Sequence, residues 1–382
     1  MYIPTLSLNI FNLKFNIMKR ITYLILFLFS VSLLFAFLPA PKKTVVTING
    51  EAFYVNGKPT YEGRTWKGNK IEGLLMNSRM VQGIFDDLNP ETRKLFGYPD
   101  TGNWDPDRNT TEFMEGMEEW KKYGLNSFTI NMQGGSPTGY GNKEWLNSAF
   151  YPDGRLRQPF MDRLKLILDK ADEMEMVVML GIFYFGQDQN LENEQAVINA
   201  VKNSVNWVLE EGYRNVLIEV NNECNVKAYV HEILMPDRVH ELIELVKTME
   251  YDGIRLLVST SYGGNTVPKP NVVKSSDYIL IHGNGVDTIE KMEILIKNTR
   301  KVEGFRPMPV VINEDDHYDF DKDRNNFTVA VENYVSWGFF DYRRDGEPFA
   351  EGYQSVPVDW GINSERKQGF FDLVKEITGG KY

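Results

Sequence analysis

Residues 216–224 read VLIEVNNEC, a short apolar run that ends in an amide beside a carboxylate. Such a run is typical of a buried strand whose C-terminal end carries polar groups. Alternation along the strand would put residues 217, 219, 221 and 223 on one side, which gives that side two glutamates. Because an ionised Glu inside a protein is costly unless it is paired or hydrogen-bonded, Glu219 and Glu223 suggest a function.

Similar apolar runs lie on both sides of this stretch and alternate with longer amphipathic segments. We predict eight strands, at residues 79–85, 127–132, 177–183, 216–221, 256–259, 278–282, 310–313 and 338–341. The predicted helices lie between most of them and after the last, at 111–123, 159–174, 191–210, 237–249, 288–300, 328–337 and 364–377. Eight βα alternations over roughly 310 residues predict an α/β fold, a single-domain (β/α)8 TIM barrel occupying residues 73–382.

The N-terminal segment has the order of a signal peptide. Residues 21–38 carry no charge and follow Lys19 and Arg20, and the small residue Ala40 comes shortly after them. We therefore expect residues 1–40 to be a signal peptide, with Met18 as a second candidate start. An uncleaved anchor helix is the alternative. Either reading predicts a protein that is periplasmic, secreted or at the cell surface and meets a membrane only through this segment.

Residues 41–72 are expected to form a strand and hairpin that cap one end of the barrel. The strand at 53–55 leads into Asn56-Gly57, a pair that tolerates the positive φ angles of a type I′ turn.

Composition excludes several classes of protein. The 42 Lys and Arg against 53 Asp and Glu give a net charge of −11, and no basic run offers a footprint for phosphates, so we expect no nucleic-acid partner. The single cysteine, Cys224, excludes an internal disulfide framework and a multi-cysteine zinc site. We predict no cofactor and no metal.

A second run, MPVVINE at residues 308–314, also brings a glutamate to the end of a predicted strand. In the barrel these are strands four and seven, which face each other across the mouth where chemistry gathers. Two carboxyl groups meeting across a cleft supply the proton donor and the ionised nucleophile or base that glycosidic cleavage requires. Glu223 and Glu314 are therefore the catalytic candidates as a pair, although either one alone would be interpreted first as an ion-paired structural residue.

The strand-four stretch resembles the corresponding motif of clan A glycoside hydrolases, especially family 5, and PVVINE resembles their strand seven. The resemblance implies that Glu223 is the general acid/base, Asn222 a ligand of the substrate 2-hydroxyl and Glu314 the nucleophile of a retaining mechanism. Cys224 stands where Pro is usual, and Asn313 where Gly is usual.

Further likenesses to this clan run in order through most of residues 50–380. The stretch SDYILIH at 276–282 resembles strand six and carries His282, with Asn284 in the place of a customary Tyr. Trp337 resembles the strand-eight Trp that floors the sugar site, and Thr129 replaces a common strand-two Arg. The substrate-binding candidates are Asn131, Asn222, Tyr262, His282, His317 and Trp337.

We therefore expect an exported retaining β-glycosidase whose partner is an oligo- or polysaccharide. One alternative is a glycan-binding barrel without turnover, in which the glutamates only hydrogen-bond sugar hydroxyls. A weaker one is a metal-dependent barrel hydrolase with ligands from Asp315, Asp316, His317 and His282, which resistance to chelators would count against. The glycine-rich residues 134–141 lack the ending of a phosphate loop and are interpreted as a mobile rim of the cleft.

Overall fold

The computed structural model describes residues 19–20, 22–23, 42–139 and 145–380. The chain divides into two units, Met1–Pro41 and Lys42–Tyr382. Most of the predicted signal segment lies outside the described residues. Within the described part of the chain, no helix has the length and apolar character needed to cross a membrane.

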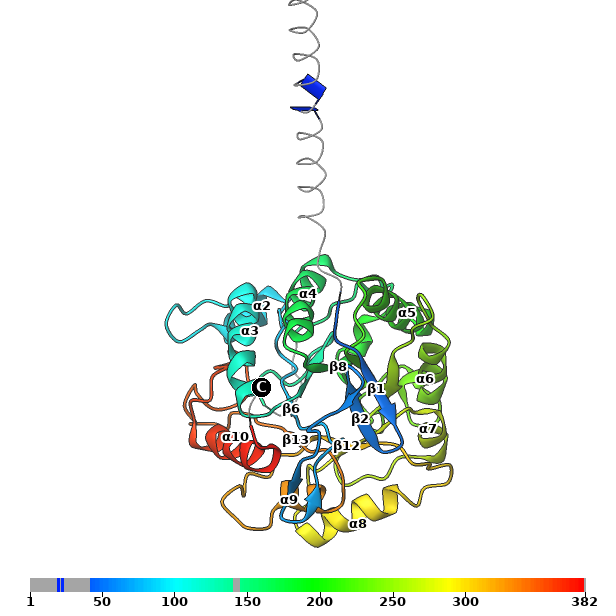
Figure 1. Cartoon of the computed structure of the whole chain (residues 1–382). Helices are drawn as coiled ribbons and strands as arrows, with labels where there is room; N and C mark the ends of the chain where they lie inside the picture. The colour runs from blue at the N-terminus through cyan, green and yellow to red at the C-terminus, as the bar shows by residue number, and fades with distance from the viewer. Residues whose placement is uncertain (1–18, 21, 24–41, 140–144, 381–382) are drawn as a thin grey trace, which may run out of the picture. The chain divides into compact units, whose positions relative to one another are not determined.

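Eight parallel strands form the centre of the larger unit, and helices surround them (Figure 1). The strands are β6 (Asn77–Arg79), β7 (Ser127–Asn131), β8 (Val177–Phe183), β9 (Val216–Asn221), β10 (Leu257–Ser259), β11 (Ile279–His282), β12 (Val310–Glu314) and β13 (Gly338–Phe339). Six of them pair in the order β10-β9-β8-β7-β6-β13, and β11 pairs with β12. Isolated parallel bridges, Val311 with Ser336 and Asp315 with Phe339, connect β12 to the β13 segment.

Between β10 and β11 the hydrogen-bonded ladder is interrupted in the described residues, and a bond from the Asp277 amide to the Val258 carbonyl, 2.9 Å long, links the two segments. The alternation of eight parallel strands with helices confirms the predicted (β/α)8 fold.

The helices begin at residues that suit helix starts. Asp105, Asn193, Thr288, Asn325 and Ser364 each cap a helix by accepting backbone N–H groups of its first turn. The helices are α2 (Pro90–Arg93), α3 (Pro106–Lys122), α4 (Gln158–Glu173), α5 (Glu194–Glu210), α6 (Val239–Lys247), α7 (Pro270–Ser275), α8 (Ile289–Thr299), α9 (Asn326–Glu332) and α10 (Glu365–Thr378).

An antiparallel sheet closes the N-terminal end of the barrel. It contains β1 (Val46–Asn49), β2 (Ala52–Val55) and β3 (Lys58–Pro59), and a further small hairpin pairs β4 (Thr65–Trp66) with β5 (Asn69–Lys70). Asn56 and Gly57 have φ angles of 52° and 77°, as the predicted type I′ turn requires. Phe53 packs with inward-facing residues of the barrel strands, among them Val177, Leu217 and Tyr278. The opposite, C-terminal end is therefore the open end.

Two predicted elements are wrong. The first barrel strand ends at Arg79, whereas the sequence predicted that it begins there, because Met80–Phe85 continues as loop. The predicted helix 328–337 ends at Glu332, and Trp337 lies just before β13.

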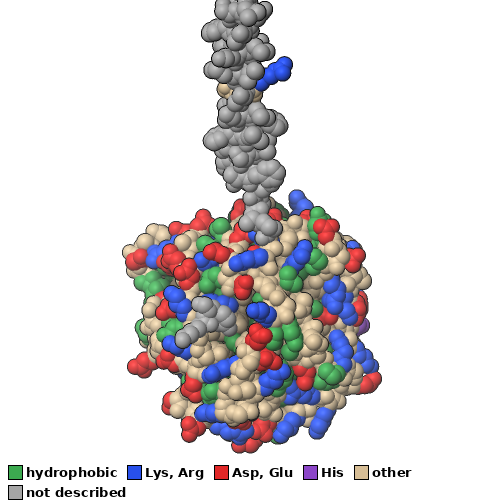
Figure 2. All heavy atoms as spheres, in the orientation of Figure 1, with side chains coloured by type: hydrophobic (Ala, Val, Ile, Leu, Met, Phe, Trp, Pro, Cys, Tyr) green, Lys and Arg blue, Asp and Glu red, His purple; other side chains and the backbone are tan. Residues whose placement is uncertain are grey.

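Figure 2 shows Lys and Arg side chains interspersed with Asp and Glu on one face of the protein.

Candidate active site

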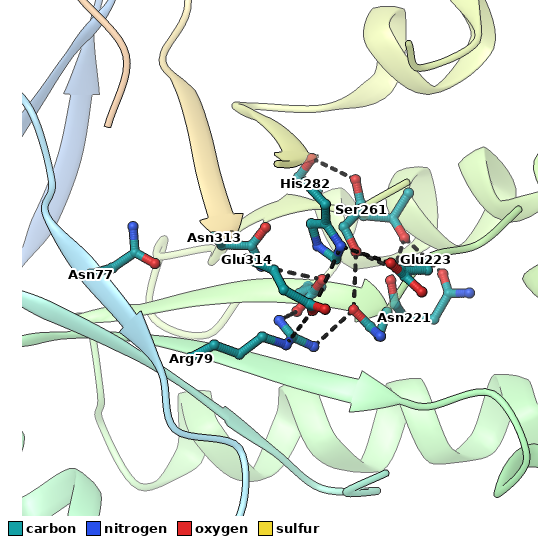
Figure 3. Close-up of polar contacts among 12 residues, drawn as sticks. Asn77, Arg79, Asn221, Glu223, Ser261, His282, Asn313 and Glu314 are labelled. Atoms are coloured by element: carbon teal, nitrogen blue, oxygen red, sulfur yellow. Dashed lines mark hydrogen bonds and ion pairs between the residues drawn. The ribbon is translucent and has the colours of Figure 1, made fainter. Parts of the chain in front are cut away.

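Glu223, His282 and Glu314 meet at the C-terminal ends of their strands (Figure 3). Each offers one ligand atom, and these atoms all lie within 4.8 Å of one another. His282 stands between the carboxylates, with Nδ1 3.0 Å from Glu223 Oε1 and 3.6 Å from Glu314 Oε2. Both catalytic candidates are thus brought together by strands four and seven of the barrel.

A backbone turn after β9 aims Glu223 at this point. Glu223 has a φ of 50°, a conformation that non-glycine residues rarely adopt and that is enriched at functional sites. Its amide donates to Ser261 Oγ at 2.9 Å, and the amide of Cys224 donates to the Ser261 carbonyl at 2.9 Å. The turn ends the alternation of the strand, so Asn221 faces Thr260 and the Leu234 carbonyl instead of the mouth.

Arg79, at the end of β6, is the residue that the sequence analysis missed. Its Nε lies 2.6 Å from Glu314 Oε2, its Nη2 donates to Asn222 Oδ1 at 2.8 Å, and its Nη1 lies 3.5 Å from Glu219 Oε2 (Figure 3). The Arg79 side chain is 1% exposed. The available signal was that Arg79 is the one charged residue between Glu72 and Asp86 in an otherwise apolar and amide-rich stretch.

Asn284 holds the other side of Glu314. Its Nδ2 donates to Glu314 Oε1 at 2.6 Å, so an amide supplies a hydrogen bond to the carboxylate at the position where the clan usually has Tyr. Glu314 therefore has Arg79 on one oxygen and Asn284 on the other.

The charges in the cluster shift one another's proton affinities. Burial lowers the pKa of His282, but the charge of Glu314 and the hydrogen bond and charge of Glu223 raise it overall. Burial raises the pKa of Glu223, but the imidazole of His282 and the charge of Arg79 lower it overall. Burial also raises the pKa of Glu314, and the raising effect of burial and Glu223 exceeds the lowering effect of Arg79, His282 and Asn284. The free site therefore favours an ionised Glu223 beside a protonated His282.

The loop after β7 is anchored at the mouth. The side-chain amides of Gln82 and Gln354 each donate to the Gly135 carbonyl at 2.7 Å, and the Tyr184 hydroxyl lies 3.0 Å from Ser136 Oγ. A side chain at Gly135 would meet the ring of Tyr184 at 1.7 Å. Residues 134–137 are buried and held in place, so the prediction of a mobile rim is wrong for them. Residues 140–144 lie outside the described residues.

Two polar candidates make no described hydrogen bond to the carboxylate pair. His317 Nδ1 is 2.6 Å from Asp315 Oδ1, and the ring contacts neither Glu223 nor Glu314 by a described hydrogen bond. Asn131 is 1% exposed, and its side chain fills the space above Gly181, where an added Cβ would lie 2.1 Å from Asn131 Oδ1. Gly181 pairs with Glu219, whose side chain faces the barrel interior, so Asn131 lies in the same row of the barrel interior as Glu219.

Both aromatic candidates are buried, and Trp337 is a core residue, which corrects the prediction for Trp337. Trp337 is 0% exposed, stacks on Phe327 with ring centroids 4.7 Å apart and donates its Nε1 to Asp315 Oδ2 at 2.9 Å. It packs outside the strands, because it belongs to the segment that enters β13. Tyr262 is 1% exposed and lies beside Cys224.

The ligand set of the metal-dependent alternative is divided between two groups in the described part of the chain. Asp315, Asp316 and His317 form one cluster, and His282 belongs to the cluster of Glu223 and Glu314. The oxygens of Asp315 also contact Trp337 Nε1 and Asn326 Nδ2. The four residues predicted as ligands are therefore not assembled as one site.

No protein-family model matches the sequence, and no curated protein matches it. Solved structures do match. An endo-1,4-β-mannanase from Rhizomucor miehei has a TM-score of 0.55 at 11% identity, over 88% of this chain and 100% of that chain. A glycoside hydrolase family 5 protein from Bacteroides vulgatus has a TM-score of 0.52 at 13% identity, over 86% and 69% of the two chains.

A β-mannanase from the blue mussel Mytilus edulis also has a TM-score of 0.52, at 10% identity over 87% of this chain and 96% of that chain. Identities this low report on backbone arrangement and not on chemistry. The chain thus has the (β/α)8 fold of family 5 glycoside hydrolases, as the resemblance of its fourth and seventh strands implied.

Proposed function

We propose that the protein is a retaining glycoside hydrolase. The observation that supports this most is the pair of carboxylates from strands four and seven, Glu314 buried and Glu223 partly exposed, with oxygens within 4.8 Å of each other. Retaining glycosidases keep their two carboxyl groups about 5 to 5.5 Å apart, whereas inverting enzymes need room for a water between them. The presence of such a pair at the catalytic end of a (β/α)8 barrel favours the retaining reaction.

In the first step Glu314 attacks the anomeric carbon and forms a glycosyl ester. The bond from that carbon to the leaving oxygen breaks with its electron pair, and Glu223 gives the oxygen a proton. In the second step Glu223 takes a proton from water, the hydroxide oxygen bonds to the anomeric carbon, and the ester electrons return to Glu314. Two inversions leave the configuration retained.

The acid step requires Glu223 to be protonated, although the free site favours its ionised form. His282 supplies the missing proton: transfer from Nδ1 to Glu223 Oε1, over 3.0 Å, leaves the net charge unchanged. A bound sugar excludes water from the cluster and thereby favours the neutral pair over the charged one. Arg79 and Asn284 stabilise the ionised form of Glu314 that the attack requires, against the raising effect of burial and Glu223 on its pKa.

Asn222 is suited to bind the substrate hydroxyl next to the anomeric carbon. Because its Oδ1 accepts from Arg79, its Nδ2 points elsewhere, and this buried donor has no partner among the described residues. A donor left unpaired in the free site gains its hydrogen bond when substrate arrives, which favours binding of the reacting sugar.

Purified protein assayed against a panel of β-linked polysaccharides, with release of reducing ends as the readout, tests the function. The neighbours named as mannanases make β-mannans the first members of the panel, followed by β-glucans and β-xylans. Glu223→Gln and Glu314→Gln should each lower the activity of the wild type by about 10³-fold or more. Azide should rescue Glu314→Gly and give a glycosyl azide of inverted configuration.

The second candidate is a glycan-binding barrel without turnover, which the lowered pKa of Glu223 favours because an ionised Glu223 cannot act as an acid. This candidate predicts that polysaccharide binds while no reducing ends appear. Unimpaired hydrolysis by Glu314→Gln would contradict both the retaining mechanism and the assignment of the nucleophile.

We also propose that the protein is exported through its N-terminal segment. The uncharged run at residues 21–38 after Lys19 and Arg20 supports this. N-terminal sequencing of the protein from its natural host should find a start near residue 41, and retention of residues 1–40 in a membrane fraction would favour the anchor.

A further inference from the structure

Glu219 is a third buried glutamate close to the catalytic pair. It lies on β9, its side chain is 0% exposed, and it faces the barrel interior, where it contacts residues from strands that are not neighbours of β9. Two residues earlier on the same strand, Leu217 belongs to the apolar cluster that the hairpin closes. Glu219 therefore lies at the boundary between two parts of the barrel interior. The part toward the N-terminal ends of the strands is apolar, and the part toward their C-terminal ends is polar.

Two polar groups reach Glu219 from across the barrel. Arg79 Nη1 lies 3.5 Å from Oε2, and Asn313 Nδ2 donates to Oε1 at 3.5 Å. Asn313 comes directly before Glu314 on β12. Glu314 contacts Arg79 directly, whereas Asn313 reaches it only through Glu219. A buried carboxylate without such partners would be strongly unfavourable.

Arg79 connects this arrangement because each of its three nitrogens contacts a different residue. Nε pairs with Glu314, Nη2 with Asn222 and Nη1 with Glu219. A guanidinium is planar, so a partner on each nitrogen fixes the plane as well as the position of the group. Glu314 alone would neutralise Arg79 but would leave the guanidinium free to rotate about the Nε contact.

We propose that Glu219 is a positioning residue, which holds the Arg79 guanidinium from below so that it aligns the nucleophile Glu314 and the sugar ligand Asn222 at once. This inference rests on the proposed function. Asn313 contributes to the same positioning, because its side-chain amide donates a hydrogen bond to the second oxygen of Glu219. Arg79, Glu219 and Asn313 come from β6, β9 and β12. This role would account for the second glutamate that strand four carries inside the barrel in addition to Glu223.

Glu219→Gln tests the proposal because it keeps the shape of the side chain and removes its charge. The substrates are 4-nitrophenyl and 2,4-dinitrophenyl β-mannosides, or the corresponding glucosides if the wild type prefers them. The 2,4-dinitrophenolate leaves without protonation, so Glu223→Gln should lose little in forming the glycosyl ester from it. Glu219→Gln should lose about 10- to 100-fold in rate per titrated active site with both leaving groups, because the nucleophile is misaligned in either case.

Two further variants separate positioning from folding. Asp341→Asn removes the charge of another fully buried carboxylate, which pairs with Arg366, and should keep the rate per titrated site. Asn313→Ala removes the amide that holds Glu219 and should reproduce part of the loss seen with Glu219→Gln. A rate per site within twofold of wild type for Glu219→Gln, or a loss confined to the poorer leaving group, overturns the proposal.

A readout that needs no turnover keeps this test separate from the test of the proposed function. The Nε–H signal of Arg79 in a ¹H–¹⁵N spectrum, assigned with Arg79→Lys, should lie downfield in the wild type because of its ion pair with Glu314. In Glu219→Gln it should move upfield or broaden. An unchanged signal overturns the proposal, whereas a wild type that cleaves no glycoside of the panel counts only against the glycosidase.

Discussion

Gly264 shows how little space surrounds the proposed acid/base. Its amide hydrogen-bonds to the carboxylate of Glu223, and a Cβ added to it would lie 1.9 Å from the backbone carbonyl oxygen of Asn284. A contact this short forces the backbone to move, since the obstacle is another backbone atom. Asn284 in turn donates to Glu314, so a shift there reaches both carboxylates.

We expect Gly264→Ala to lower kcat/KM by about 10²-fold, because displacement of a catalytic group by about 1 Å has an effect of this size. Gly263→Ala is the matched control, since its added Cβ would have its nearest neighbour at 3.4 Å, an ordinary contact. Steady-state kinetics of both variants check the prediction, with melting temperatures to confirm folding. Equal activity in the two variants would contradict it.

His282 should titrate above the usual histidine range. Its ordinary pKa is 6.5, and Glu314 is the strongest of the charges that raise it. Removing that negative charge makes the imidazolium less favourable, so Glu314→Gln should lower the pKa of His282. The ring signals of the four histidines, followed by NMR from pH 4 to 9 and assigned with His282→Gln, check this sign. A pKa of His282 that rises in Glu314→Gln would contradict the charge assignment.

At the scale of elements, the β1–β2–β3 sheet covers the N-terminal end of the barrel, opposite the site. Phe53 is 0% exposed and meets Tyr278 edge to face, with ring centroids 6.3 Å apart. Its neighbour Tyr54 is only partly buried. The two side chains alternate between the barrel interior and the outside, as successive residues of a strand do.

Phe53→Ala should therefore reduce the free energy of unfolding by about 3 to 5 kcal/mol, the usual cost of truncating a buried Phe. The activity of the folded fraction should be unchanged, because the cavity opens at the far end of the strands. Denaturant unfolding measures the first quantity and active-site titration the second. Tyr54→Ala should reduce the free energy of unfolding clearly less. A similar reduction in both variants would show that packing of the β1–β2–β3 sheet on the barrel does not depend on Phe53.

At the scale of the whole molecule, the pH dependence of stability has one well-defined contributor at the C-terminal side of the barrel. Asp341 is fully buried, and burial raises its pKa from 3.8 to about 6, although Arg366 and Lys367 lower it. Between these two values the folded protein binds more protons at Asp341 than the unfolded chain does. The free energy of unfolding therefore falls as the pH rises through this range.

Asp341→Asn removes this dependence, because Asn does not titrate. From pH 3.5 to pH 7 the wild type should lose roughly 3 kcal/mol of stability relative to the variant, the free energy that corresponds to the change in pKa. Unfolding in urea at several pH values measures the difference. A stability of the wild type relative to the variant that stays constant, or that rises with pH, would contradict the assignment.

The fold was predictable because its signals are local. The boundaries predicted for β8 and β9 agree with the structure to the residue, since continuous apolar runs mark strands buried on both faces. The first barrel strand was predicted to begin two residues too late and to end six residues too late, although Arg79 was included. A shift of two residues keeps the same face of a strand, so the apolar pattern around Arg79 did not reveal whether it began or ended the strand.

The sequence by itself determined the barrel, the hairpin at its N-terminal end and the two glutamates at the C-terminal ends of two facing strands. Periodicity, an Asn-Gly turn and a polar strand end are each recognised within a few residues. Only the tertiary structure decided which groups surround those glutamates. Arg79, Glu219 and Asn284 come from three different strands or their following loops, and Trp337 packs against Phe327 outside the ring. Distances and charge states at the site depend on how the strands face one another across the barrel, and no local pattern carries that information.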